Sequence, residues 1–140
     1  MRPAGVVTKA DLVQSLPFLN EIVVVTLTGA QLRAALRNSL SLLISSDVTD
    51  NPAGRFLQVS NLFFSWFFQQ GAPVLGEVRV GAERWLVNDS SKLTFATNSY
   101  VAGGGDGFGM SVGAGRPKRR TGIVIYGAVA TYLATHAATA

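Results

Sequence analysis

Two segments of the sequence carry residues whose types and spacing could bind a small ligand. Phe18 and Asn20 follow a proline that ends a helix, in the stretch Leu-Pro-Phe-Leu-Asn. Tyr100 precedes a glycine-rich run, residues 101–115, in which Asp106 is the only acidic residue. Each segment therefore offers an aromatic ring beside a polar group, at the end of a regular element.

A ring on each segment and a carboxylate among glycines together suit a nucleoside. Glycines allow positive φ angles and a close approach of the backbone to a ligand. An aromatic ring that stacks on a base contributes about 1–3 kcal/mol in nucleic-acid complexes, and a carboxylate can accept hydrogen bonds from both ribose hydroxyls. A purely structural interpretation stays open, in which the rings cover an edge of the core and the aspartate bends the chain.

Other chemistries that glycine-rich or acidic loops perform are excluded by the residues present. The glycines of residues 103–109 fit neither the phosphate loop nor the dinucleotide-binding pattern. Asp47 begins a sequence like a calcium loop, but Pro52 occupies the position of the turn glycine. The chain has no cysteine and His136 is its one histidine, which excludes a Ser/His or Cys/His triad and a two-metal hydrolytic site. We expect no catalytic residue and no metal ligand in this chain.

Composition indicates one folded domain without a basic binding face. The 140 residues are 48% hydrophobic and only 14% charged, which excludes a disordered chain. The net charge of +4 depends on one run, Arg116 to Arg120, that contributes four of the twelve positive residues. We therefore expect no nucleic-acid partner and interpret the run as a solvated turn. Contact of this run with an acidic partner, a lipid surface or a nucleic acid is a weaker alternative.

No segment of the sequence predicts a signal peptide or a membrane span. Residues 1–5 lead directly into a capped helix without an apolar stretch. The tail from Thr121 to Ala140 carries no charged residue, but its strongly apolar part, residues 122–134, is shorter than the ~20 residues that a span needs. We expect a buried amphipathic helix there.

Hydrophobic periodicity and capping signals place the elements. Thr8 with Asp11, and Thr28 with Gln31, form two capping boxes that begin helices. The first helix ends at Pro17, and the second extends to about Ser45. Strands are expected at residues 21–27, within 56–68, and at 78–80, 84–87 and 92–98. Gly71, Pro73 and Gly76 are expected to break the chain between the second and third of these strands. A last helix is expected over residues 123–135. The pattern predicts a single α+β domain, residues 1–140, in which helices cover a mostly antiparallel sheet system.

Four motifs in this order resemble the C-terminal domain of the 5'-nucleotidase family, which also includes UDP-sugar hydrolases and 2',3'-cyclic-nucleotide phosphodiesterases. The likeness extends over about residues 3–133. The motifs are Val-Thr-Lys-Ala-Asp-Leu with Leu-Pro-Phe-Leu-Asn (7–20), Leu-Thr-Gly-Ala-Gln-Leu (27–32), Gly-Arg-Phe-Leu-Gln-Val-Ser (54–60) and Ala-Thr-Asn-Ser-Tyr-Val-Ala-Gly-Gly-Gly-Asp-Gly-Phe (96–108).

The resemblance implies a layered α/β/β/α sandwich and a division of labour between two domains. An N-terminal metallophosphoesterase domain, expected to be absent from this chain, would carry two divalent metal ions and the catalytic residues. This domain would bind the nucleoside or nucleotide. By the same resemblance Phe18 and Tyr100 would sandwich the base, Asn20 and the backbone of Gly54 would contact its edge, and Asp106 would bind the ribose hydroxyls.

Two positions depart from the family's pattern: Tyr100 replaces a more common phenylalanine, and Asn61 stands where Ser-Gly is usual. The family's phosphate-binding motif, Asn-Gly-Gly-x-Ile-Arg, is not found in the sequence. The resemblance thus implies a substrate-recognition domain of a periplasmic, secreted or cell-surface hydrolase, inert by itself. The choice among nucleotide, UDP-sugar, cyclic nucleotide or another ester stays open. So does a non-catalytic interaction domain that keeps the fold.

Overall fold

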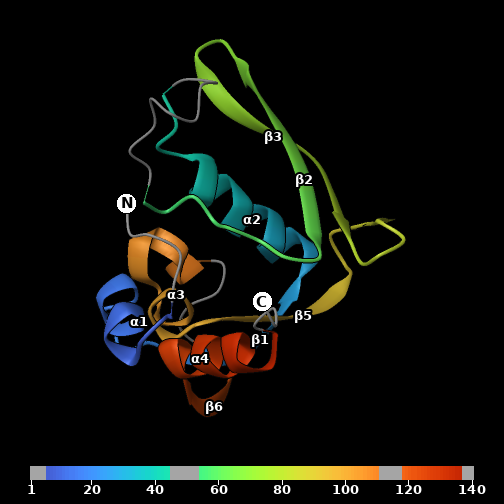
Figure 1. The fold of residues 1–140 in the computed structure, drawn as a ribbon. Helices are drawn as coiled ribbons and strands as arrows, with labels where there is room; N and C mark the ends of the chain where they lie inside the picture. The colour runs from blue at the N-terminus through green and yellow to red at the C-terminus, as the bar shows by residue number, and fades with distance from the viewer. Residues whose placement is uncertain (1–5, 45–53, 111–117, 137–140) are drawn as a thin grey trace.

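The computed structural model describes residues 6–44, 54–110 and 118–136 (Figure 1). Its elements are, in chain order, α1 (Lys9–Ser15), β1 (Glu21–Thr28), α2 (Gly29–Leu40), β2 (Leu62–Gln69), β3 (Ala72–Val80), β4 (Trp85–Leu86), β5 (Lys92–Asn98), α3 (Ser99–Gly103), the 3-10 segment η2 (Gly105–Met110), β6 (Lys118–Val124) and α4 (Ile125–His136).

The strands form two three-stranded sheets, with the orders β5-β1-β6 and β2-β3-β4, and every pairing is antiparallel. β1 is the central strand of the first sheet. Its alternate residues Val23, Val25 and Leu27 are buried, which is the period-2 pattern of a strand with one face on the core. The segment that precedes β1, residues 16–20, is therefore attached to one end of the central strand of this sheet.

Helix α2 links the two sheets, because it contributes to two separate hydrophobic clusters. Ala35 packs with β1, whereas Leu32 and Leu36 pack with β2 and β3. Figure 1 shows α2 beneath the long β2–β3 hairpin. Phe95, on β5, packs against both clusters and thus connects them.

Both predicted capping boxes are present, but α2 is shorter than the sequence predicts. Thr8 caps α1 with Asp11, and Thr28 caps α2 with Gln31. α2 ends at Leu40 rather than near Ser45, since the backbone N–H of Ser41 and its hydroxyl both turn back to the carbonyl of Asn38. The hydroxyl thus competes with continuation of the helix.

The expected breaks at Pro73 and Gly76 are wrong, because both residues lie within β3. Pro73 sits near the start of the strand, where a missing N–H is tolerated. Gly76 faces a bulge on β2: a side chain there would place its Cβ 2.4 Å from Ser65 Oγ. The predicted hairpin at Gly81 is confirmed, with Val80 paired to Trp85 and Gly81 at φ +81°.

The predicted turn is corrected in part: Lys118, Arg119 and Arg120 are exposed, as expected of a solvated segment, but they lie in a strand, and Arg116 falls outside the described residues. Residues 118–124 form β6 on the edge of β1, and Arg120 forms an ion pair with Glu21, whose exposed fraction is 9%. Helix α4 follows and packs against α1, but none of its residues is buried, so the expected buried amphipathic helix is also wrong. Of the helices that the structure describes, none is long and apolar enough to cross a membrane.

Candidate functional site

The segment between α1 and β1 lies against the N-terminus of α3. The Ser99 hydroxyl donates a hydrogen bond to Oδ1 of Asn20 (3.1 Å) and accepts one from the N–H of Glu21 (3.1 Å). The carbonyl of Asn20 accepts a hydrogen bond from the N–H of Ile125, at the start of α4 (3.0 Å). Asn20 is therefore fixed by its side chain and its backbone, beside the residue that precedes Tyr100.

The two aromatic side chains singled out in the sequence are both exposed at this end of the sheet. Phe18 is 74% exposed and Tyr100 is 50% exposed. Large apolar rings left in water are available for contact with a ligand or a partner. The Asn20–Ser99 bond brings the segments that carry them together, because Phe18 precedes Asn20 by two residues and Tyr100 follows Ser99.

Tyr100 and Asp106 are in direct contact. The Tyr100 hydroxyl donates a hydrogen bond to Oδ1 of Asp106 (2.9 Å). The ring lies against Gly105, where the Cβ atom of any other residue would stand only 2.4 Å from ring carbons Cε1 and Cζ. Glycine at 105 is thus required for this ring position, and the ring is held by a backbone surface and by its hydroxyl.

Asp106 is held from its other side by helix α2. Its backbone is in the left-handed region, at φ +51°, and Gly107 follows at φ +82°. Nδ2 of Asn38 donates a hydrogen bond to the carbonyl of Asp106 (2.9 Å). This contact supports a backbone conformation that non-glycine residues rarely adopt.

Charge around Tyr100 disfavours its ionisation. The hydrogen bond to Asp106, followed by the repulsion between a phenolate and that carboxylate, raises the pKa of Tyr100 above its ordinary value. The positive charge of Arg55 acts in the opposite direction. The guanidinium of Arg55 donates a hydrogen bond to the Ser41 hydroxyl (3.3 Å), just after the end of α2.

Gly54, the fifth residue predicted for the site, precedes Arg55 and is exposed. A Cβ atom at this position would meet no described atom within 4 Å. No steric requirement for glycine is found there among the described residues, so the predicted contact of its backbone with a base stays a prediction.

Sequence reasoning did not identify Asn38, Ser99 or Arg55 as members of this arrangement. Asn38 and Asp106 are 68 residues apart, and Asn20 and Ser99 are 79 residues apart. One signal was available, since Ser99 and Arg55 fall within the motifs that carry the family resemblance. Asn38 carries no comparable signal, because a polar residue beside the apolar face of a helix is usually solvated.

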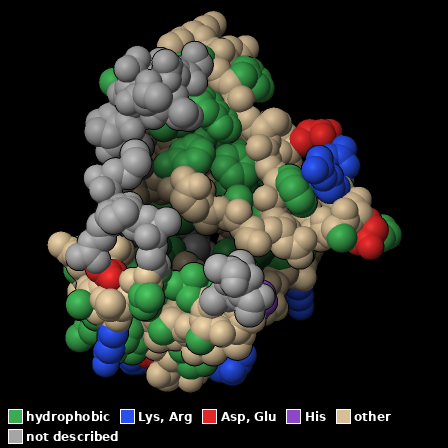
Figure 2. All heavy atoms as spheres, in the orientation of Figure 1, with side chains coloured by type: hydrophobic (Ala, Val, Ile, Leu, Met, Phe, Trp, Pro, Cys, Tyr) green, Lys and Arg blue, Asp and Glu red, His purple; other side chains and the backbone are tan. Residues whose placement is uncertain are grey.

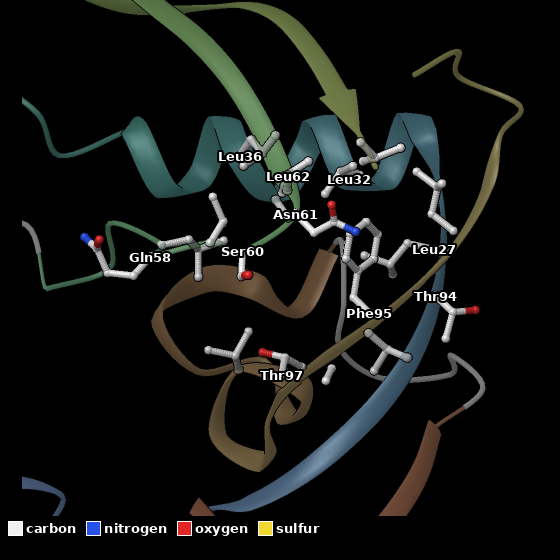
Figure 3. A pocket seen from close by; sticks show the side chains of 18 of the residues that line it. Leu27, Leu32, Leu36, Gln58, Ser60, Asn61, Leu62, Thr94, Phe95 and Thr97 are labelled. Carbon is white, nitrogen blue, oxygen red and sulfur yellow. The ribbon is translucent and has the colours of Figure 1, made fainter. Parts of the chain in front are cut away.

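A cavity with a volume of about 690 Å³ lies elsewhere in the domain. It opens between β1, α2, β5 and the segment 57–62, and none of the five predicted residues lines it (Figure 3). Figure 2 shows apolar side chains gathered around a hollow beneath the β2–β3 hairpin. The cavity has polar groups on Gln58, Ser60, Asn61, Thr94 and Thr97, and none of the described residues that line it is titratable.

No group of three or more His, Cys, Asp or Glu residues that could hold a metal ion is found within residues 6–44, 54–110 and 118–136. The donor set that a divalent metal centre needs is therefore not assembled by the described part of the chain.

Comparison with known proteins assigns the fold. Residues 1–113 match the family described as 5'-nucleotidase, C-terminal domain. The 5'-nucleotidase precursor of Thermus thermophilus is 30% identical and superposes with a TM-score of 0.76, over 91% of this chain. The NAD nucleotidase of Haemophilus influenzae, 20% identical, has the same fold with a TM-score of 0.72 over 95% of this chain. The predicted α+β class with antiparallel sheets is confirmed.

The chain corresponds to only part of each of these proteins. It covers 24% of the Thermus protein and 25% of the Haemophilus protein. The trifunctional nucleotide phosphoesterase protein YfkN of Bacillus subtilis (strain 168) is 30% identical over 111 residues, which is 76% of this chain and 7% of that protein. On the match of residues 1–113 and these relatives, the chain belongs to the 5'-nucleotidase family, as its C-terminal domain.

Proposed function

We propose that this domain binds the nucleoside part of a nucleotide for a metal-dependent phosphoester hydrolase. The observation that carries the proposal is the contact of an exposed ring with a carboxylate, Tyr100 with Asp106, beside the segment that holds Phe18 and Asn20. A base would stack between the rings of Phe18 and Tyr100, and the ribose would donate hydrogen bonds to Asp106. Asn20 and the backbone of Gly54 would contact the edge of the base.

The domain's part in the reaction would be to position the substrate. In the proposed parent enzyme, two divalent metal ions and the residues that bind them belong to an N-terminal metallophosphoesterase domain outside this chain. Metal ions there would supply an activated water for attack on the phosphate. This domain would fix the nucleoside end, which lowers the entropic barrier of the step. We expect the chain alone to release no phosphate from AMP when divalent metal is added, and sustained release would contradict this.

Support for a nucleotide substrate comes from the relatives. Their names describe a 5'-nucleotidase precursor, an NAD nucleotidase and a nucleotide phosphoesterase. We propose the same substrate class here, and a location outside the cytoplasm as in the family. The rival function is a non-catalytic interaction domain that keeps the fold, for which exposed Phe18 and Tyr100 would serve as protein contacts.

The test is an NMR titration of the domain with adenosine and then AMP. We expect shifts that cluster at Phe18, Asn20, Tyr100 and Asp106, with a dissociation constant near 1 mM, or about −4 kcal/mol, because phosphate contacts from the partner domain are missing. Phe18→Ala, Tyr100→Ala and Asp106→Ala should each weaken binding at least severalfold.

Trp85→Ala is the matched control, because Trp85 is an exposed aromatic residue on β4, in the other sheet. Its removal should leave the titration unchanged. Absence of binding, or equal weakening by Trp85→Ala, would overturn the nucleoside site and favour the interaction domain.

A further inference from the structure

We propose that the hydroxyl of Tyr100 relaxes the selection of the sugar, so that the site accepts nucleosides that lack one ribose hydroxyl almost as well as ribonucleosides. This inference rests on the proposed function and names the substrate class more closely. Its basis is the hydrogen bond from the Tyr100 hydroxyl to Oδ1 of Asp106 at 2.9 Å.

Strong discrimination by a hydroxyl needs a protein group that is left unpaired when the hydroxyl is missing. Asp106 does not meet that condition at Oδ1, because Tyr100 already supplies a donor there. An ionised carboxylate has about four acceptor positions on its two oxygens, so a ribose can add its own hydrogen bonds without displacing Tyr100. A deoxy sugar forms fewer bonds but leaves the carboxylate partnered.

The geometry indicates that this arrangement persists when a base is bound. The ring is backed by Gly105, so its hydroxyl can stay on Asp106 while the other ring face receives the base. The backbone carbonyl of Asp106 accepts a hydrogen bond from Asn38 at 2.9 Å, which holds the backbone that carries the carboxylate in place beside Tyr100. The hydroxyl of Tyr100 and the sugar hydroxyls therefore act on the same carboxylate.

Phenylalanine at this position would keep the stacking ring and remove only the internal donor. In Tyr100→Phe the carboxylate of Asp106 would depend on water or on the ligand for its hydrogen bonds. A nucleoside that lacks a sugar hydroxyl and excludes water from the site would then leave an acceptor unpaired. The variant should discriminate more sharply among sugars than the natural chain does.

The experiment measures dissociation constants for adenosine, 2'-deoxyadenosine, 3'-deoxyadenosine and 2',3'-dideoxyadenosine, by NMR titration of the natural chain and of Tyr100→Phe. For the natural chain we expect each monodeoxy nucleoside to bind within about threefold of adenosine. In Tyr100→Phe, the dissociation constant of the more weakly bound monodeoxy nucleoside should exceed that of adenosine by about tenfold. This is the scale of one hydrogen bond to a charged group. Tyr132→Phe, a change at an exposed tyrosine of α4, is the matched control and should leave all ratios unchanged.

The outcomes separate this inference from the function on which it rests. Preference of the natural chain for adenosine by tenfold or more, or equal ratios in the natural chain and Tyr100→Phe, would overturn the role of the hydroxyl while the nucleoside site stands. Absence of binding by every nucleoside would overturn the nucleoside site, and the inference with it. A spectrum of Tyr100→Phe that matches the natural chain away from α3 and η2 establishes that the variant is folded.

Discussion

Tyr100 is restrained by two neighbours, Gly105 against its ring and Asp106 at its hydroxyl. Titration of the Tyr100 hydroxyl reports whether the contact with Asp106 exists in solution. The phenol donates to the carboxylate, so loss of its proton would place two negative charges side by side. The pKa of Tyr100 is therefore raised above its ordinary value of 10.0. A raised pKa means that the folded state retains the proton more strongly, so the contact stabilises the fold below pH 10 and this contribution is lost as pH rises through the folded-state pKa.

Asp106→Asn should lower the pKa of Tyr100 towards its ordinary value. Ultraviolet difference absorption of tyrosinate measures the titration, and Tyr100→Phe identifies which of the three tyrosine transitions belongs to this residue. If Asp106→Asn leaves all three transitions where they are in the natural chain, the Tyr100–Asp106 contact is not populated in solution.

At the scale of elements, Asn61 shows how one residue sets the start of a strand. It precedes β2 with φ +57°, and its carbonyl accepts a hydrogen bond from the N–H of Gly81 (3.1 Å). Asparagine tolerates the left-handed region better than other side chains do, and glycine adopts it freely. This explains why Asn61 can replace the glycine that the family resemblance led us to expect.

Substitution at Asn61 should therefore follow backbone preference rather than side-chain contact. Asn61→Val should lower the free energy of unfolding by about 1–3 kcal/mol, because a β-branched residue is strained at positive φ. Asn61→Gly should stay within about 0.5 kcal/mol of the natural chain, since relief of strain is offset by a more flexible unfolded state. Urea denaturation measures both. Equal stability of the two variants would contradict the assigned φ.

Elements with local signals were predictable from the sequence, and those fixed by distant contacts were not. The capping boxes at Thr8 and Thr28 and the strand 92–98 depend on neighbouring residues, and the structure confirms them. β6 was missed because its partner, β1, lies about a hundred residues earlier and its first residues are all basic. The same distinction between local and distant contacts applies to the candidate site. Tyr100 and Asp106 are six residues apart, whereas the contact of Asn38 with Asp106 arises only when α2 packs beside η2.

At the scale of the molecule, the two hydrophobic clusters are joined through a small number of side chains. Phe95 packs against both clusters, whereas Phe64 packs against only the cluster of α2 with β2 and β3. The cavity of about 690 Å³ lies between them and is lined in part by Phe95. The sheets are therefore coupled less tightly than they would be by one continuous core.

Phe95→Ala should lower the free energy of unfolding by more than the partial burial of Phe95 alone implies, because the substitution weakens two hydrophobic clusters at once. We expect a loss of about 3 kcal/mol in the free energy of unfolding, against about 1–2 kcal/mol for Phe64→Ala, the control of the same residue type. Urea denaturation followed by fluorescence and by circular dichroism measures both variants. Equal losses for the two variants would show that Phe95 does not couple the clusters.

Glu21 connects the early and late parts of the chain. Its carboxylate accepts hydrogen bonds from Nε of Arg120 (2.6 Å) and from the N–H of Gly122 (2.5 Å), about a hundred residues later. The hydrogen bond from Arg120, then that from Gly122, lowers the pKa of Glu21, and burial opposes them. The neighbouring Asn20 accepts from Ile125, so this junction also supports the segment that carries Phe18.

Acidification should therefore weaken the fold through Glu21. Because its pKa is lowered in the folded state, the contribution of Glu21 to stability is fully present above its ordinary pKa of 4.5 and is lost as pH falls through the folded-state value. Urea midpoints measured from about pH 6 down to pH 3 should fall in the natural chain and change less in Glu21→Gln, which has no proton to gain. Glu77→Gln removes an exposed partner of Arg79 and should retain the acid-dependent loss of the natural chain. An equally steep loss in Glu21→Gln would mean that other carboxylates cause the acid sensitivity.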